Sequence, residues 1–434
     1  MEINTILILI FFFIVLMMGT PIAFCMLFIG FIGLSSVIGL IPALTFAKTT
    51  LYHSIANWLY ICIPMFILMG NFASRSGIIT DIYKFFNMWL GKLPGALAIV
   101  TIATSAMFAF ATGSSLAATA VLGKICLPEM DRHNYKRKLS LGSIVAGGSL
   151  GNLIPPSIGL PLFGIITDQS IGKLLMAAIL PGLIVSGLFI VVIIIMVKRK
   201  PELAPPIIEQ VSISEKIASF KNVWGLFLII VVVLGSIFTG IATVTEAASI
   251  GAFFSFLIFL QRKKFSWKTL KEILIDTGRT SSMIFFIIVS VTLFSRFLTF
   301  SGLTRYLGDL VITHRYIPPL FILLCIYIIF IFFGCLMDAT SMMLILTPIF
   351  FPIITKLGFD PIWFGVMTVI WIEIGFLTPP VGMCCYVLKS VSNASLDEIF
   401  NSIYPFLLSW FIGVFLLTVF PEISLFLPKL MMGK

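Results

Sequence analysis

The sequence predicts an all-α polytopic membrane protein built from two inverted repeats. Of its 434 residues, 59% are hydrophobic and only 11% are charged, whereas about 25% are charged in typical soluble domains. The apolar residues form continuous runs instead of alternating with polar ones, which favours helices over an outer-membrane barrel. Two interrupted apolar runs recur at one fixed spacing, which indicates an internal repeat.

Apolar runs of roughly 17–25 residues are long enough to cross a bilayer as helices. We therefore expect spans at Ile3–Met18, Pro21–Leu40, Trp58–Ser74, Leu174–Val197, Val223–Phe238, Glu246–Leu260, Ser281–Phe300 and Tyr404–Leu427. The first of these lacks a basic leader and a small-residue cleavage site, so we interpret it as a mature span. Two amphipathic segments, 41–57 and 261–279, are expected to lie along the interface, and 75–92 is expected to be a polar connection.

Two apolar runs are too long for one span and too short for two. The run 94–127 is interrupted by small residues at 111–115, and the run 317–354 is interrupted at 334–340. This pattern predicts re-entrant hairpins whose tips reach the membrane centre.

Proline pairs interrupt two further runs, Leu139–Ile166 at Pro155-Pro156 and Ile362–Leu388 at Pro379-Pro380. Proline removes a backbone donor and clashes with the preceding turn, so each pair must break a helix and leave carbonyl groups unpaired. Within hydrocarbon, such carbonyls are tolerated only where they line a polar cavity. Two broken helices at matching places in two halves therefore point to the binding site of a transporter near the bilayer midplane.

The landmarks of the two halves are separated by a constant 224 residues: Pro94 pairs with Pro318, Pro128 with Pro352, and Pro155 with Pro379. We expect repeats at 1–197 and 223–434 joined by a cytoplasmic linker at 198–222. Each repeat has five full spans plus a hairpin, an odd number of crossings, so the second is inverted. Most of the 28 lysines and arginines lie on the cytoplasmic side if both termini lie outside.

Hairpin tips that meet broken helices place helix ends at the midplane. Free carbonyls there suit a hard cation such as Na⁺, and hydroxyls and helix N-termini suit an anionic substrate. The candidate cation ligands are Gly113, Ser114, Ser115, Asn152 and Ile154 in the first half, and Gly334, Asp338, Thr340, Leu377 and Thr378 in the second. For each residue alone, a purely structural role in a tight turn stays open.

Three acidic residues fall within apolar runs, where ionisable groups are usually functional. Asp338 is expected at the second hairpin tip, which favours ion or substrate contact. Glu246 and Glu373 are equally consistent with capping or interhelical hydrogen bonding. Arg296 either meets a substrate carboxylate or extends to the membrane surface.

Several classes of function are disfavoured. The basic residues lie in short clusters between apolar runs, where the positive-inside rule for membrane orientation explains them, and they do not indicate a nucleic-acid-binding patch. The seven cysteines show no metal or disulfide spacing and the three histidines are scattered, so no zinc site is predicted. The sequence has no Walker A motif and no activated serine, which argues against an ATPase and against an enzyme.

Several motifs together resemble the large membrane subunit of the tripartite ATP-independent periplasmic (TRAP) transporters. They are Gly19-Thr20-Pro21-Ile22-Ala23-Phe24, Ala111-Thr112-Gly113-Ser114-Ser115, Pro128-Glu129-Met130, Gly151 through Ser157, Ala242 through Ala248, Met337-Asp338-Ala339-Thr340 and Glu373 through Gly382. The resemblance covers essentially the whole chain.

The resemblance implies the transport subunit of a bacterial inner-membrane importer with an elevator-type fold and both termini in the periplasm. The partners would be a small four-span membrane subunit and a periplasmic substrate-binding protein, and the substrate an organic acid such as a C4-dicarboxylate, a sialic acid or another sugar acid. Na⁺ would be the coupling ion, with no other cofactor. The family's ion-site region falls on Gly113, Ser114, Ile154-Pro155, Asp338, Thr340, Thr378 and Pro379.

Substrate contact is expected from Ser115, Pro155, Pro156, Asp338, Pro379 and Arg296. Asn152 departs from the family pattern, in which an apolar residue is expected. Two other functions stay open: a stand-alone Na⁺ symporter of the divalent-anion type, and a passive anion channel.

Overall fold

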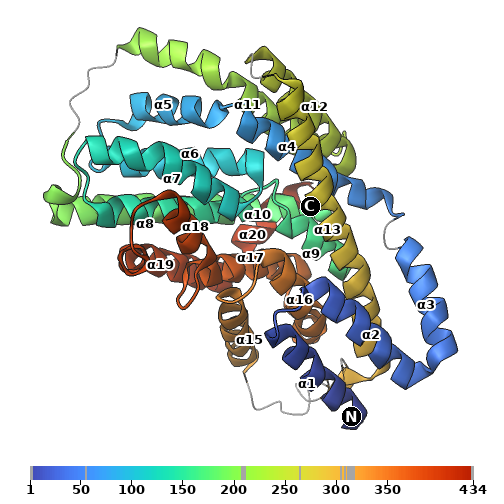
Figure 1. Ribbon diagram of the computed structural model, residues 1–434. Coiled ribbons are helices and arrows are strands. Elements are labelled where there is room, and N and C mark those ends of the chain that lie inside the picture. Colours follow the sequence, from blue (N-terminus) through green and yellow to red (C-terminus); the bar gives the residue numbers. More distant parts are fainter. Residues whose placement is uncertain are drawn as a thin grey trace.

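The computed structural model describes residues 3–53, 56–206, 212–262, 265–303, 305, 306, 309 and 318–431. Within these ranges all regular secondary structure is helical (Figure 1), which confirms the all-α prediction. Seven helices of the described part are long and apolar enough to cross a membrane. The start of the second predicted hairpin, residue 317, and part of the predicted linker, 207–211, lie outside the described residues.

The first half of the chain contains α1 (Ile3–Met17), α2 (Ile22–Ile38), α3 (Leu40–His53), η1 (Trp58–Ile61), α4 (Cys62–Arg75), α5 (Ile78–Leu90), α6 (Ala96–Thr112), α7 (Ser115–Arg132), α8 (Arg137–Gly148), η2 (Ser149–Asn152), α9 (Gly159–Thr167) and α10 (Ile171–Arg199). After η3 (Pro201–Leu203), the second half contains α11 (Ile213–Thr239), α12 (Val244–Gln261), α13 (Trp267–Phe300), α15 (Pro319–Gly334), α16 (Ala339–Lys356), α17 (Pro361–Leu377), α18 (Met383–Val391), α19 (Leu396–Val419) and α20 (Glu422–Met431).

The two expected hairpins and the two broken helices are all present as helix pairs with a non-helical break between them. The first hairpin is α6 and α7, and the second is α15 and α16. The broken helices are α8 with η2 and α9, and α17 with α18. Both proline pairs, Pro155-Pro156 and Pro379-Pro380, lie in the breaks and have cis peptide bonds. The domain bounds and the inverted relation of the halves stay predictions.

Four expectations are wrong in detail, of which three concern short segments and the fourth concerns α13. The predicted polar connection 75–92 contains helix α5, because Ile78, Ile79, Ile82 and Phe85 recur at helical spacing and form a buried face. The predicted linker includes the first turns of α11, which begin at a capping box formed by Ser212 and Glu215. The last predicted span ends at Val419, and α20 follows Pro421 as a separate helix.

The fourth correction concerns α13. The sequence predicts an interfacial segment followed by a span, but the structure has one helix of 34 residues, about 50 Å long. No proline interrupts it, and α4 stabilises its first half: the Asn71 amide donates to the Thr277 hydroxyl at 2.8 Å, and Arg75 pairs with Glu272 at 3.0 Å. The helix therefore exceeds the roughly 30 Å hydrocarbon thickness.

Helix α17 lies at the centre of the molecule. Every residue from Ile362 to Leu377 is buried, as expected for a helix that is apolar on all sides. It packs against the second hairpin, α15 and α16, and against α10, α19 and η2. The long helix α13 packs against α2, α3 and α4, and it also contacts α16 (Figure 1).

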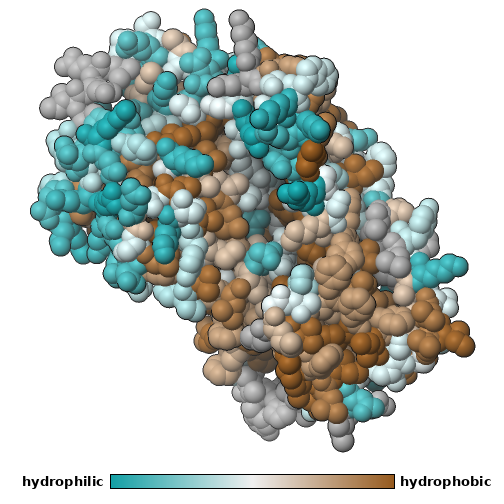
Figure 2. Space-filling view, viewed as in Figure 1, coloured by the Kyte–Doolittle hydropathy of each residue, from teal (hydrophilic) through white to brown (hydrophobic). Residues whose placement is uncertain are grey.

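Large hydrophobic side chains are exposed along α1 and α2, including Ile10, Phe11, Phe28 and Ile32. Figure 2 shows that apolar residues gather on the part of this face that holds α1, α2 and α16, while hydrophilic residues dominate near α5 to α8. An apolar surface of this extent is stable only against lipid or another protein.

Candidate functional site

The first hairpin tip is built around Gly113. Its φ of +58° ends α6 in the left-handed conformation, and its N–H donates to the Ala109 carbonyl at 3.1 Å. A Cβ atom at this position would lie 2.8 Å from the Pro156 carbonyl oxygen. Glycine is therefore required both by the backbone angle and by the close approach of the tip to the first break.

Ser114 and Ser115 follow with different roles. The Ser114 hydroxyl accepts a hydrogen bond from Ala117 N–H at 3.4 Å and caps α7. Ser115 is buried, and its Oγ accepts from Asn152 N–H at 3.1 Å. Ser115 therefore joins the hairpin tip to the broken helix, whereas Ser114 serves its own helix.

The first break runs from Leu153 to Ile158 between η2 and α9. The Asn152 side chain spans it, since Oδ1 accepts from Gly159 N–H at 3.2 Å. The carbonyl groups of Gly113 and Ile154 accept no hydrogen bond from any described residue. The predicted residues Ser115 and Asn152 are thus joined by a hydrogen bond, and Gly113 lies against the break that contains Ile154.

The second tip is also a short break between two helices, but Gly334 does not adopt the left-handed conformation of Gly113. Helix α15 ends at Gly334, and a Cβ atom on Gly375 of α17 would lie only 2.7 Å from the Gly334 Cα atom. The Cys335 thiol donates to the Pro379 carbonyl at 3.4 Å. The tip of the second hairpin is therefore packed directly against the second break, and the Gly334 carbonyl accepts no hydrogen bond from the described residues.

Asp338 caps α16. Its Oδ2 accepts from Ser341 N–H at 3.1 Å, and its Oδ1 accepts from the Ser341 hydroxyl. Thr340 lies in the first turn of the same helix. At the break, the Thr378 hydroxyl donates to the Ile374 carbonyl at 2.7 Å, and the Leu377 carbonyl accepts a weak contact from the Cys385 thiol at 3.9 Å. Asp338 is half-buried and retains lone pairs toward a neighbouring cavity.

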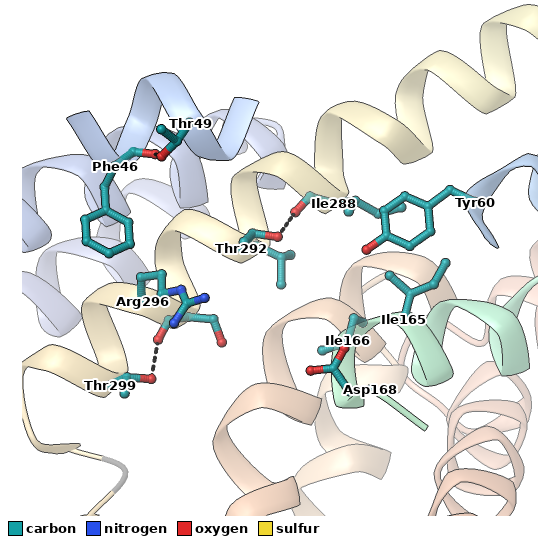
Figure 3. Close-up of a pocket in the computed structure, with 12 residues that line it drawn as sticks. Phe46, Thr49, Tyr60, Ile165, Ile166, Asp168, Ile288, Thr292, Arg296 and Thr299 are labelled. Atoms are coloured by element: carbon teal, nitrogen blue, oxygen red, sulfur yellow. Dashed lines mark hydrogen bonds between the residues drawn. The ribbon is translucent and has the colours of Figure 1, made fainter. Parts of the chain in front are cut away.

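Arg296 lines a cavity of about 500 Å³ between α13, α3 and the end of α9. Figure 3 shows Arg296, Thr292 and Thr299 projecting from α13, with Asp168 across the cavity. The guanidinium lies 5.9 Å from the centre of the Phe46 ring, a cation–π distance. Arg296 forms no ion pair with the described residues, so its charge is available to a carboxylate in this cavity.

The predicted substrate residues do not share one cavity. Asp338 lines a second cavity of about 650 Å³ with Pro21 and Ile287, while Ile288, the next residue on α13, lines the cavity of Arg296. Successive helical residues point about 100° apart, so the two cavities lie on different faces of α13. Pro155 and Pro156 are buried, and Pro379 is exposed.

The acidic residues left open by the sequence have different environments. Glu246 closes a capping box with Thr243, whose N–H donates to the carboxylate at 2.8 Å, so its role is the structural one. Glu373 is fully buried, and neither of its carboxylate oxygens has a hydrogen-bond partner of normal geometry among the described residues. The only sequence signal for Glu373 is a single charge in an otherwise apolar helix.

The oxygens at the two breaks fit a hard monovalent cation. They are backbone carbonyls, hydroxyls and one amide, supplemented by Asp338, a set that suits Na⁺ at broken helices. The described residues contain no group of three or more His, Cys, Asp or Glu that could hold a metal ion.

Comparison with known proteins agrees with this geometry. Residues 9–423 match the family model of the tripartite ATP-independent periplasmic transporter, DctM component. The chain is 34% identical to the C4-dicarboxylate TRAP transporter large permease of Pseudomonas aeruginosa, over 87% of this chain and 88% of that one. It is 30% identical to the sialic acid TRAP transporter large permease of Vibrio cholerae, over 96% of each chain.

Solved structures show the same fold at low sequence identity. The YdaH transporter of Alcanivorax borkumensis matches with a TM-score of 0.66 at 14% identity, over 88% of each chain. MtrF of Neisseria gonorrhoeae matches with a TM-score of 0.60 at 12% identity, over 87% of this chain and 84% of that one. The relatives that show the family are membrane permease subunits and not enzymes, and the chain belongs to the DctM family of TRAP transporter large permeases.

Proposed function

We propose that this chain is the transport subunit of a Na⁺-coupled importer of organic acids that depends on a substrate-binding protein. The observation that carries the proposal is the pair of hairpin tips packed against broken helices, where the Gly113, Ile154 and Gly334 carbonyls accept no hydrogen bond from the described residues. Free carbonyls inside a membrane protein need a bound cation or water. Na⁺ at both breaks supplies that partner.

The substrate class follows from the relatives. Their printed substrates include C4-dicarboxylates, sialic acid and 2,3-diketo-L-gulonate, which carry a carboxylate, and isethionate, which carries a sulfonate, so all four are organic acids. The cation held at the breaks neutralises part of this negative charge. Of the expected substrate contacts, Arg296 forms no ion pair with the described residues and adjoins a cavity of about 500 Å³, and Asp338 lines a cavity on a different face of α13.

An elevator mechanism accounts for the close packing of the tips. When Na⁺ occupies both breaks, the tips close over ion and substrate, and the domain formed by hairpins and broken helices crosses without exposing unpaired backbone to lipid. Helices α2, α4, α12 and α13, which pack against one another, form the static scaffold. The repeats 1–197 and 223–434 have opposite orientation in this scheme.

The partners are a small membrane subunit and a periplasmic binding protein. One relative, the isethionate TRAP transporter permease DctMQ, matches 95% of this chain but only 64% of its own length, which leaves room in that protein for a fused second subunit. The exposed apolar residues of α1 and α2 contact this subunit or lipid. The location is the bacterial inner membrane, with both termini in the periplasm.

The test is uptake of radiolabelled organic acids into proteoliposomes that contain this chain and its small partner. Uptake is measured with and without an inward Na⁺ gradient and with and without purified binding protein. Uptake that requires both supports the proposal. Uptake with Na⁺ alone indicates a stand-alone symporter, and uptake that requires neither indicates a passive channel.

A further inference from the structure

Glu373 is a charged side chain in the most buried helix of the molecule. The exposed fraction of its side chain is 0%, and all residues from Ile362 to Leu377 of α17 are buried with it. Both carboxylate oxygens lack a hydrogen-bond partner of normal geometry, and no lysine, arginine or histidine of the described residues forms an ion pair with it. An acidic group in this environment is costly unless something neutralises it.

The polar neighbours of Glu373 belong to the other half of the chain. The side chains of Ser115 and Asn152 lie near its carboxyl group, although neither makes a hydrogen bond of normal geometry to it, and α17 packs against η2, which ends at Asn152. The Asn152 Nδ2 atom is also buried without a partner. Three buried polar groups therefore meet where the first hairpin tip, the first break and α17 come together.

These groups complete the oxygen set of the first break. The Ser115 hydroxyl already accepts from Asn152 N–H and retains a further lone pair. The Gly113 and Ile154 carbonyls accept no hydrogen bond from the part of the chain that the structure describes, but the first-half residues at this break supply no negative charge. The second tip, in contrast, contains Asp338. Glu373 is the acidic group that would give the first break a matching charge.

We propose that Glu373 is the anionic ligand of the cation site at the first break, contributed by the second half of the chain. The inference rests on the proposed Na⁺ coupling and adds a ligand to it. Gly375, two residues further along α17, touches Gly334 at the second tip. The two cation sites then share one helix, so occupancy of one site constrains the element that forms the other.

The test is Na⁺ binding by the purified full-length chain in detergent. The melting temperature is followed as Na⁺ replaces choline at constant ionic strength, because a ligand at free concentration L that binds only the folded state stabilises it by RT ln(1 + L/Kd), and a fit of this rise gives the half-saturating Na⁺ concentration. Glu373→Gln keeps the size of the side chain and one acceptor oxygen, and it replaces the second oxygen by an uncharged NH₂ donor. We expect it to raise the half-saturating Na⁺ concentration at least about tenfold.

Glu422→Gln is the matched control, because Glu422 is exposed on α20 and pairs with Lys429; we expect no change in its half-saturating concentration. Glu373→Asp keeps the charge but withdraws it by one methylene, and we expect an intermediate value. If Glu373→Gln does not fold, Glu373→Asp carries the test, and a half-saturating concentration equal to that of the wild type overturns the proposal.

Two failures are distinguishable. A wild-type chain whose melting temperature does not respond to Na⁺ contradicts the proposed Na⁺ coupling itself. A wild-type response that Glu373→Gln reproduces at the same Na⁺ concentration leaves the coupling intact and overturns only the role of Glu373.

Discussion

The two breaks have the same local sequence chemistry but different surroundings. Residues 151–157 of the first break are all buried, whereas Pro379 and Pro380 of the second are exposed. Helix α10 covers the first break, since a Cβ atom on Gly182 would lie 2.6 Å from Ile154 Cγ1, and the Trp410 indole of α19 donates to Ser149 Oγ at 3.3 Å. The second break is therefore more accessible from the surface of the molecule than the first.

The caps of the two hairpin tips differ as well. A neutral hydroxyl, Ser114, caps α7, and a carboxylate, Asp338, caps α16. Both satisfy a backbone N–H of the helix that follows the tip. At the second tip, Asp338 both caps the helix and carries the charge. At the first tip, Ser114 caps α7, and the charge that we propose for this site belongs to the distant Glu373.

The contact between glycines at the second tip gives the largest expected effect. In Gly375→Val, the added atoms collide with the Gly334 backbone, which cannot move aside as a side chain can. We expect a loss of about 3 kcal/mol of stability and little folded protein by size-exclusion chromatography. Gly235→Val is the control, because a Cβ there meets nothing within 4 Å. Equal yields of the two variants would refute the tight contact.

Replacing Asp338 by asparagine separates capping from charge at the second tip. Asparagine caps helices as well as aspartate does, so we expect an unchanged melting temperature without Na⁺. If the charge serves ion binding, Na⁺-driven uptake in proteoliposomes falls at least about tenfold. Asp338→Ser, which gives the second tip the cap of the first, is expected to behave in the same way. Full uptake in both variants would leave Asp338 with a capping role only.

Ser115→Ala tests the joint between the first tip and its broken helix. It removes the acceptor of the buried Asn152 N–H, and an orphaned buried donor costs about 1–2 kcal/mol. Chemical denaturation of the purified chain measures this loss. Ser115→Thr, which keeps the hydroxyl, is expected to recover part of it; no recovery would indicate that packing and not the hydrogen bond is responsible.

Ser114→Ala is expected to have the smallest effect. It removes the cap of α7 alone, at a cost of about 1 kcal/mol or less, because Ser114 is half-buried and its hydrogen bond to Ala117 N–H is long at 3.4 Å. We expect Na⁺-dependent uptake to be retained. A loss of uptake as large as that of Asp338→Asn would show that the neutral cap of the first tip and the charged cap of the second tip are equally important for transport.

The sequence alone determined the local features of this protein. Prolines without a backbone donor, glycines at the tips and small capping residues act through their immediate neighbours, so Gly113, Gly334 and both proline pairs identified the breaks. The spans followed from the length of apolar runs, and the motifs around the breaks identified the TRAP family before any comparison.

The tertiary structure alone decided which of these features meet and what surrounds them. The length of α13 depends on contacts with α4, and the buried face of α5 depends on α6 and α11. The meeting of Glu373 with Ser115 and Asn152 joins residues more than two hundred positions apart. Equal proline motifs become buried in one half and exposed in the other because burial is set by packing from distant helices, which no local pattern records.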